Sequence, residues 1–183
     1  MRAGFVIETH SPQETAALGR CAGRQASPGQ VFCLRGELGT GKTVFISGLA
    51  SGLLGREIPV TSPSYVLEHV HRGKAATLYH IDLYRLAAGA ADFDGAGLRE
   101  CLTDPQGVAC IEWADRLAGL LPDDRIDVEI EHVSPQRRAV HVLATGPRSG
   151  QVVDRVVRSA GTRERLLASM LAQPDRASAG EAS

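Results

Sequence analysis

GELGTGKT, at residues 36–43, matches the full pattern of a phosphate-binding loop: a glycine, any four residues, then glycine, lysine and a hydroxyl residue. Its lysine, Lys42, is one of only two lysines among the 20 lysines and arginines of the chain. A compact ammonium group suits a phosphate cradle, where the flat fork of an arginine would not act as a point charge. The octet therefore predicts nucleotide-phosphate binding, against the alternative of a purely structural glycine turn.

The segments on either side of the octet have the order that such a loop requires. Residues 31–34, VFCL, form a continuous apolar run that is typical of a buried strand. The stretch TVFISGLASGLLG then carries apolar residues at helical spacing as far as Gly55. Strand, glycine loop and helix thus follow one another, and the positive end of the helix is predicted to point at the phosphates.

Each kind of residue in the loop has an expected role. Backbone N–H groups would surround the phosphate oxygens, Lys42 would bridge the outer phosphates, and the hydroxyl of Thr43 would bind Mg²⁺. Guanine recognition through an Asn/Thr-Lys-x-Asp loop is excluded, because the other lysine, Lys74, lies in RGKAAT. ATP is therefore the expected nucleotide. The loop positions that we expect at the nucleotide are Gly36, Glu37, Leu38, Gly39, Thr40, Gly41, Lys42 and Thr43.

Two predicted strands end in a carboxylate: TLYHID ends in Asp82, and VACIE ends in Glu112. A carboxylate at the end of a strand beside the loop can hold Mg²⁺ or its water shell, and another can orient the attacking water. The unbroken apolar run before Glu112 favours a parallel strand next to the loop, so we expect Glu112 to hold the metal. Asp82 then takes the water-orienting or switch role. The alternative for each acid is a surface salt bridge.

The rest of the chain predicts an α/β fold, a P-loop NTPase-like mixed sheet of parallel strands and antiparallel hairpins flanked by helices. Ser11, Pro12 and Glu14 have the spacing of a helix start, and ASPGQ at residues 26–30 ends that helix. Further strands are expected at residues 5–7, on both sides of a turn at 72–74, at 107–113, and in the pair RIDVEIEHV and RRAVHVLAT. A loop with a short helix is expected at 87–100 and a second short helix at 114–122.

Length and composition bound the domain organisation and the compartment. Residues 1–146 are predicted to form one P-loop ATPase domain, and residues 147–183 a helical appendix followed by a disordered tail. The net charge of −1 does not favour nucleic-acid binding by this chain alone. An apolar run of membrane-spanning length and a signal-peptide pattern are both missing, which predicts a cytoplasmic protein.

Four motifs together resemble one family. GELGTGKT, VTSPSYVL, YHIDLYRL and IEWAD, in this order and at this spacing, are similar to the bacterial TsaE (YjeE) ATPases of tRNA threonylcarbamoyladenosine synthesis. The resemblance runs from about Thr9 to Gly146. It implies an ATPase that uses ATP and Mg²⁺, is weak alone, and acts on TsaD-like and TsaB-like partners. Those partners modify adenosine 37 of tRNAs reading ANN codons, so that tRNA is met only through the complex.

The resemblance also implies roles for single residues. Lys42 and the loop glycines would hold the phosphates, Thr43 and Glu112 the magnesium ion, and Asp82 would be needed for hydrolysis. Further positions implied at the nucleotide are Thr9 and Ser11 near the adenine, Thr61 and Ser62 in a switch-like segment, Trp113, and Arg138, with the neighbouring Arg137 as its alternative.

Two other functions stay open at this point. A small-molecule kinase on the same scaffold would use Asp82 to deprotonate an acceptor hydroxyl, and it would need an arginine-bearing lid. Residues 87–100 contain only Arg99, which counts against it. A nucleotide sensor without hydrolysis would bind ATP and would not need Asp82.

Overall fold

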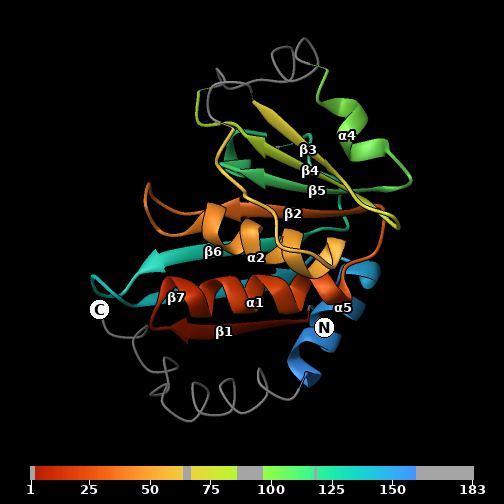
Figure 1. Cartoon of the computed structure of the whole chain (residues 1–183). Helices are drawn as coiled ribbons and strands as arrows, with labels where there is room; N and C mark the ends of the chain where they lie inside the picture. The colour runs from red at the N-terminus through yellow and green to blue at the C-terminus, as the bar shows by residue number, and fades with distance from the viewer. Residues whose placement is uncertain (1–2, 64–66, 86–96, 118, 160–183) are drawn as a thin grey trace, which may run out of the picture.

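The computed structural model describes residues 3–63, 67–85, 97–117 and 119–159, and seven strands in these ranges form one sheet (Figure 1). The strands are β1 (Gly4–Thr9), β2 (Gln30–Arg35), β3 (Glu68–Arg72), β4 (Thr77–Asp82), β5 (Gly107–Glu112), β6 (Ile126–His132) and β7 (Arg138–Ala144). Their order across the sheet is β1-β7-β6-β2-β5-β4-β3.

The centre of the sheet is parallel and its margins are antiparallel. Strand β2 pairs in parallel with both β5 and β6, and β4 pairs in parallel with β5. Strands β1 and β7, β6 and β7, and β3 and β4 pair antiparallel. The predicted mixed sheet is confirmed. Because β2, β4, β5 and β6 are parallel, their carboxyl ends lie at one edge, where ligands bind in open α/β sheets.

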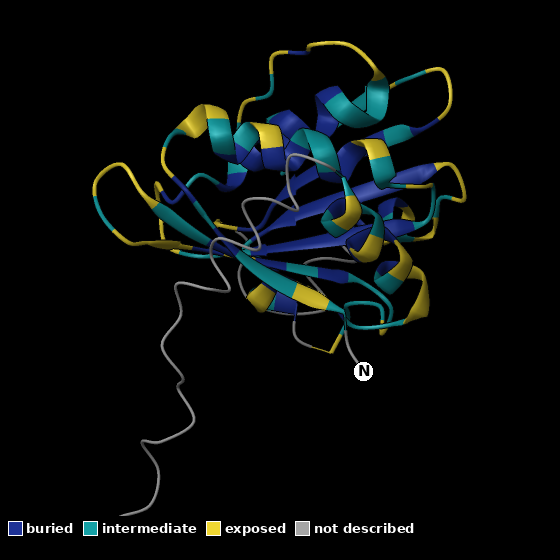
Figure 2. Cartoon of the chain, turned by 90° about the horizontal axis from the view of Figure 1, so that it is seen from below, coloured by how far each residue is buried: buried dark blue, intermediate teal, exposed yellow. Residues whose placement is uncertain are grey.

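Helices cover both faces of the sheet. Helices α1 (Pro12–Gln25), α2 (Lys42–Leu54) and α5 (Pro147–Arg158) share a core cluster with Phe32 and Leu34 of β2. The helix α4 (Arg99–Thr103) and the 3₁₀ turn η1 (Ala114–Leu117) share a second cluster with Val31 and Cys33. Since alternate residues of a strand point to opposite faces, the two clusters lie on opposite sides of the sheet. Figure 2 shows the buried sheet between more exposed helices.

Helices α1 and α2 approach each other through glycines on both sides. A Cβ built on Gly19 would lie 2.1 Å from the carbonyl oxygen of Phe45, and one on Gly23 would lie 2.1 Å from that of Leu49. The reverse contacts, from α2 to α1, are made by Gly48 and Gly52. The two helices therefore touch backbone to backbone, and both pack in the core cluster that includes Phe32 and Leu34 of β2.

Most predicted elements are present with small shifts in their ends. Ser11 Oγ accepts a hydrogen bond from the Glu14 N–H at 3.2 Å, which confirms the predicted cap of α1. The helix predicted at 114–122 was wrong in its length and type, because η1 is a 3₁₀ turn of only four residues. Gly119 has a left-handed φ of 88°, a conformation that ends helices. Residues 64–66 of the predicted hairpin and residues 87–96 of the predicted loop lie outside the described residues.

The predicted appendix begins with helix α5, whose Val152, Val153 and Val156 are buried in the first core cluster. Residues 160–183, which contain the predicted tail, lie outside the described residues, and the boundary at residue 146 stays a prediction. In the described part of the chain, membrane crossing is ruled out for every helix by its length or its polarity.

Candidate nucleotide site

The loop between β2 and α2 has a backbone that requires its glycines. Gly36, Gly39 and Gly41 have φ values of 128°, 78° and 109°, which residues with a Cβ rarely adopt. A Cβ on Gly36 would also lie 2.2 Å from the carbonyl oxygen of Ile130. All three glycines are thus favoured by the shape of the loop, and Gly36 is also needed for the loop to approach β6.

The first turn of α2 presents unpaired donors to this loop. The first internal hydrogen bond of the helix runs from Phe45 N–H to Gly41 O, at 2.9 Å. The backbone N–H groups of Lys42, Thr43 and Val44 donate no hydrogen bond within the described part of the chain. Three N–H groups at the positive end of a helix can bind an anion such as a phosphate group.

Lys42 lies within the loop rather than on the surface. Its Nζ donates to the carbonyl oxygens of Gly36 and Glu37, both at 2.8 Å, and lies 4.1 Å from the centroid of the Trp113 ring. Burial lowers the pKa of the Lys42 ammonium from its usual 10.5, and the nearby carboxylates, Glu112 first, oppose this shift. The lysine is thus a partly desolvated cation at the loop, where its attraction for a phosphate would be stronger than in bulk water.

Glu112 joins α2 to the sheet. Its Oε1 accepts a hydrogen bond from the Thr43 hydroxyl at 2.8 Å and lies 2.9 Å from Nε2 of His80. Glu112 ends β5, which is parallel to β2, as we expected from the apolar run before it. The carboxylate and the hydroxyl that were predicted to share a metal ion are therefore in direct contact.

Asp82 lies beside Glu112 at the same edge of the sheet. The two residues are partners in the β4–β5 register, and both are buried. The Asp82 carboxylate accepts hydrogen bonds from the Ser62 hydroxyl and, at 2.8 Å, from the Tyr84 N–H. Both acids are buried beside the loop, so neither forms the surface salt bridge that was the alternative for each of them.

The remaining loop positions are spread around this centre. Thr40 is buried, and its hydroxyl donates to the Glu37 carbonyl at 3.0 Å. The Leu38 side chain is 73% exposed at the tip of the loop. Arg138 Nε donates to the Thr40 carbonyl at 3.1 Å, whereas Arg137 pairs with Glu8 at 3.0 Å. Of the two arginines, Arg138 is therefore the one that contacts the loop.

The residues predicted near the adenine have protein partners. Thr9 is buried, and its hydroxyl lies 2.8 Å from that of Thr15. Thr15 in turn is close to the loop, since a Cβ on Gly41 would lie 3.8 Å from its methyl carbon. The Ser11 hydroxyl caps α1, and Thr61 is exposed next to Ser62. Nothing in these contacts tests a role in adenine binding, which stays a prediction.

Two residues were missed by sequence reasoning. Thr15 links Thr9 to the loop, and its only signal was a hydroxyl on the inner side of an otherwise apolar helix face. The Tyr84 ring packs against the Trp113 ring at a tilt of 45°, with ring centroids 5.1 Å apart, and the Arg116 guanidinium lies 5.9 Å from the centroid of the Tyr84 ring. Trp113 itself has a left-handed φ of 61°, which is unusual for a bulky residue and turns its ring toward Lys42.

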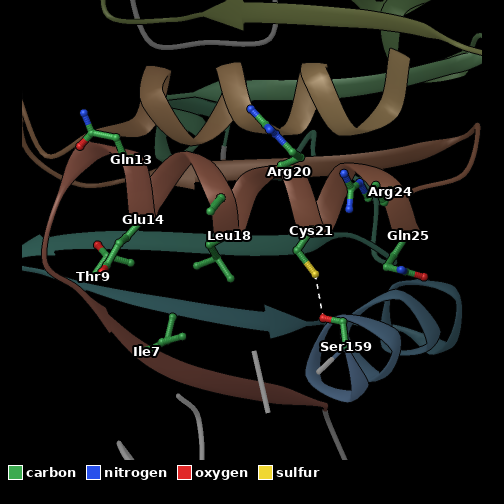
Figure 3. Close-up of a pocket in the computed structure, with 11 residues that line it drawn as sticks. Ile7, Thr9, Gln13, Glu14, Leu18, Arg20, Cys21, Arg24, Gln25 and Ser159 are labelled. Carbon is green, nitrogen blue, oxygen red and sulfur yellow. Dashed lines mark hydrogen bonds between the residues drawn. The ribbon is translucent and has the colours of Figure 1, made fainter. Parts of the chain in front are cut away.

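A separate hollow of about 630 Å³ lies along the outer side of α1 (Figure 3). It is lined by Ile7 and Thr9 of β1, by α1 side chains, and by Ser159, whose hydroxyl lies 2.9 Å from the Cys21 sulfur. No residue of the loop at 36–43 lines it. We place the candidate site at the loop, because the lysine, the unpaired N–H groups and the two carboxylates are there.

The donor set of the site fits nucleotide phosphates with Mg²⁺. Among the described residues, no group of three or more His, Cys, Asp or Glu side chains could hold a metal ion. The Thr43 hydroxyl and the Glu112 carboxylate are hard oxygen ligands, and Mg²⁺ is commonly held by one or two such groups together with water and substrate phosphates. The unpaired N–H groups and Lys42 supply the cradle for those phosphates.

Comparison with known proteins agrees with the motifs. Residues 9–140 match the family described as "Threonylcarbamoyl adenosine biosynthesis protein TsaE". A relative named tRNA threonylcarbamoyladenosine biosynthesis protein TsaE, from Treponema pallidum, is 40% identical over 134 residues, which cover 73% of this chain and 96% of the relative. The protein of the same name from Bacillus subtilis is 35% identical over 140 residues, which cover 76% of this chain and 85% of that protein.

A solved structure shares the fold. The crystal structure of Bacillus subtilis YdiB superposes with a TM-score of 0.71 at 29% sequence identity, covering 86% of this chain and 97% of that one. The family match covers the loop, both carboxylates and Arg138. The chain belongs to the TsaE family of threonylcarbamoyl adenosine biosynthesis proteins.

Proposed function

We propose that this chain is a Mg²⁺-dependent ATPase that serves the threonylcarbamoylation of adenosine 37 in tRNAs reading ANN codons. It would act in the cytoplasm on a TsaD-like and TsaB-like pair and meet tRNA only through that complex. Its family supports the pathway, and the names of its relatives point the same way. The observation that carries the ATPase reading is the group formed by Lys42, Thr43, Glu112 and Asp82 at one edge of the sheet.

The loop and α2 would bind the phosphates. The N–H groups of Lys42, Thr43 and Val44 would donate to phosphate oxygens, and the Lys42 ammonium would move from the Gly36 and Glu37 carbonyls toward the outer phosphates. Thr43 and Glu112 would hold the magnesium ion. When bound, that ion neutralises the charge that develops on the phosphate oxygens.

Asp82 would orient the attacking water. Its carboxylate is buried and held by Ser62 and Tyr84, so that its direction is set before the reaction begins. An oriented carboxylate can accept a hydrogen bond from water and aim its lone pair at the outer phosphorus. Arg138 is engaged with the Thr40 carbonyl and with carbonyls of the β6–β7 turn. With these contacts in place, Arg138 is not free to stabilise the charge that develops on the outer phosphate. We therefore expect slow hydrolysis by the chain alone and stimulation by its partners.

The test separates binding from hydrolysis. Asp82→Asn should lower phosphate release by at least about 100-fold, the usual size of a general-base or water-orienting contribution, while ATP affinity stays within about threefold of wild type. Phosphate release is measured with and without the purified TsaD-like and TsaB-like proteins, and binding by calorimetry. Lys42→Met, which removes the phosphate-binding charge, is the control that should lose binding itself.

The same experiment decides against the other functions. A nucleotide sensor would show no difference between wild type and Asp82→Asn. A small-molecule kinase, which the comparisons do not support, would produce a phosphorylated metabolite rather than free phosphate. ATP binding without stimulation by, or association with, the partner pair would refute the proposed pathway role.

A further inference from the structure

His80 lies behind the carboxylate that is proposed to hold magnesium. Its side chain is fully buried in β4, and its Nε2 lies 2.9 Å from Glu112 Oε1. The same oxygen accepts the hydrogen bond from the Thr43 hydroxyl at 2.8 Å. One carboxylate oxygen therefore receives both contacts, one from the sheet and one from the first turn of α2.

The surroundings of His80 select one tautomer. Its other ring nitrogen, Nδ1, is buried and has no hydrogen-bond partner among the described residues. A hydrogen on Nδ1 would be a buried donor without an acceptor, which is costly. The hydrogen therefore lies on Nε2, and His80 donates to Glu112 rather than accepting from it. The ring is also packed by His69 of β3, edge to face at a centroid distance of 6.5 Å.

These contacts restrict the carboxylate. The last torsion angle of a glutamate is broad and has no sharp rotamers of its own. Two donors on Oε1, from different elements, set the plane of the Glu112 carboxylate, and no described residue donates to Oε2. The Thr43 hydroxyl has one hydrogen and two lone pairs, so it can donate to Glu112 and still offer its oxygen to a metal ion.

We propose that His80 is a positioning residue for Glu112: its Nε2–H holds the carboxylate in the orientation that binds Mg²⁺ together with Thr43. This inference rests on the proposed function. Groups that orient a metal-binding side chain commonly change metal affinity by 10- to 100-fold when they are removed. Loss of the Nε2–H should therefore raise the Mg²⁺ concentration that nucleotide binding needs. Phosphate binding by the loop should stay intact.

The test compares three substitutions at one position. Gln places an N–H donor where Nε2 stands, Asn places its donor nearer to Nδ1, and Leu offers none. For each variant, binding of a non-hydrolysable ATP analogue is measured by calorimetry in EDTA and at increasing Mg²⁺ concentrations. His80→Leu and His80→Asn should raise the half-saturating Mg²⁺ concentration by about tenfold or more, and His80→Gln should stay within about threefold of wild type. Affinity in EDTA should be unchanged in all of them.

His69→Gln is the matched control, since it alters the neighbouring ring without touching Glu112, and its Mg²⁺ dependence should equal that of wild type. Melting temperatures show which variants fold; if His80→Leu does not, the Gln and Asn variants still decide. Equal Mg²⁺ dependence in His80→Asn and His80→Gln would overturn the inference. Failure of the wild type to bind the analogue would instead refute the proposed function.

Discussion

Gly48→Ala tests whether α1 and α2 must touch backbone to backbone. The added Cβ would lie 1.9 Å from the carbonyl oxygen of Ala16 and 2.7 Å from its carbonyl carbon. Both atoms belong to the backbone, so no side chain can turn away. An ordinary contact between carbon and oxygen needs about 3.3 Å. The helices must therefore separate by about 1.4 Å at this point, given the 1.9 Å in the structure.

The expected cost follows from two opposing effects. Overpacking a close contact destabilises a protein by about 1–3 kcal/mol, and a clash with backbone belongs at the upper end of that range. Alanine is a better helix former than glycine, which stabilises the folded state by about 1 kcal/mol. The free energy of unfolding should therefore fall by about 2 kcal/mol, and the melting temperature by about 4–8 °C for a chain of this size.

Gly150→Ala in α5 is the matched control. It makes the same substitution inside a helix, but a Cβ on Gly150 would meet nothing within 4 Å. Only the gain in helix propensity remains, so Gly150→Ala should raise the free energy of unfolding by about 0.5–1 kcal/mol. Both variants are compared with wild type by urea unfolding and thermal melting. A Gly48→Ala protein as stable as Gly150→Ala would refute the close helix contact.

Two further predictions concern α5 and the loop. Partial burial raises the pKa of Asp124, but hydrogen bonds from Ser149 and from the first N–H groups of α5 outweigh it and bring the pKa below its usual 3.8. Because a carboxylate with a lowered pKa stabilises the fold above its unfolded pKa, Asp124→Asn should cost about 0.3–1 kcal/mol at pH 7. It removes the negative charge at the start of α5 and one of the two acceptors for the Arg148 and Ser149 N–H groups. In urea unfolding, the difference in the free energy of unfolding between this variant and wild type should close as the pH falls below 3.8. A difference that persists at low pH would contradict the role of the charged carboxylate. For the second, ATP with Mg²⁺ should change the emission of Trp113, the only tryptophan, because the Lys42 ammonium 4.1 Å from its ring would move toward the phosphates. Lys42→Met should lack this change; an equal change in that variant would show that the emission does not report on the lysine.

The parts of the site that could be predicted are those that follow from local sequence. A glycine loop between an apolar run and a helix was predictable, because the glycines that allow positive φ at Gly36 and Gly41 and the apolar residues of α2 are all visible in the local sequence. The meeting of Asp82 and Glu112 could also be expected, since both end strands and parallel strands end at the same edge.

The contacts that were missed depend on register and on packing between elements. His80 reaches Glu112 diagonally across the β4–β5 pair, and one residue of slip would turn it to the other face of the sheet. The Gly19 and Gly48 contacts need the helices at their actual separation. The glycines recur at helical spacing in the sequence, but only the helix pairing shows that they face each other.

The two carboxylates of the site are held in different ways. The partners of Glu112 come from regular elements, Thr43 from α2 and His80 from β4, whose positions are set by the sheet and by the α1–α2 contact. Two partners of the Asp82 carboxylate, Ser62 and Tyr84, come from segments outside the strands and helices. On the proposed function, a partner that contacts those segments would act on Asp82 more directly than on Glu112. Such a contact would then change the proposed hydrolysis more than the proposed metal and phosphate binding.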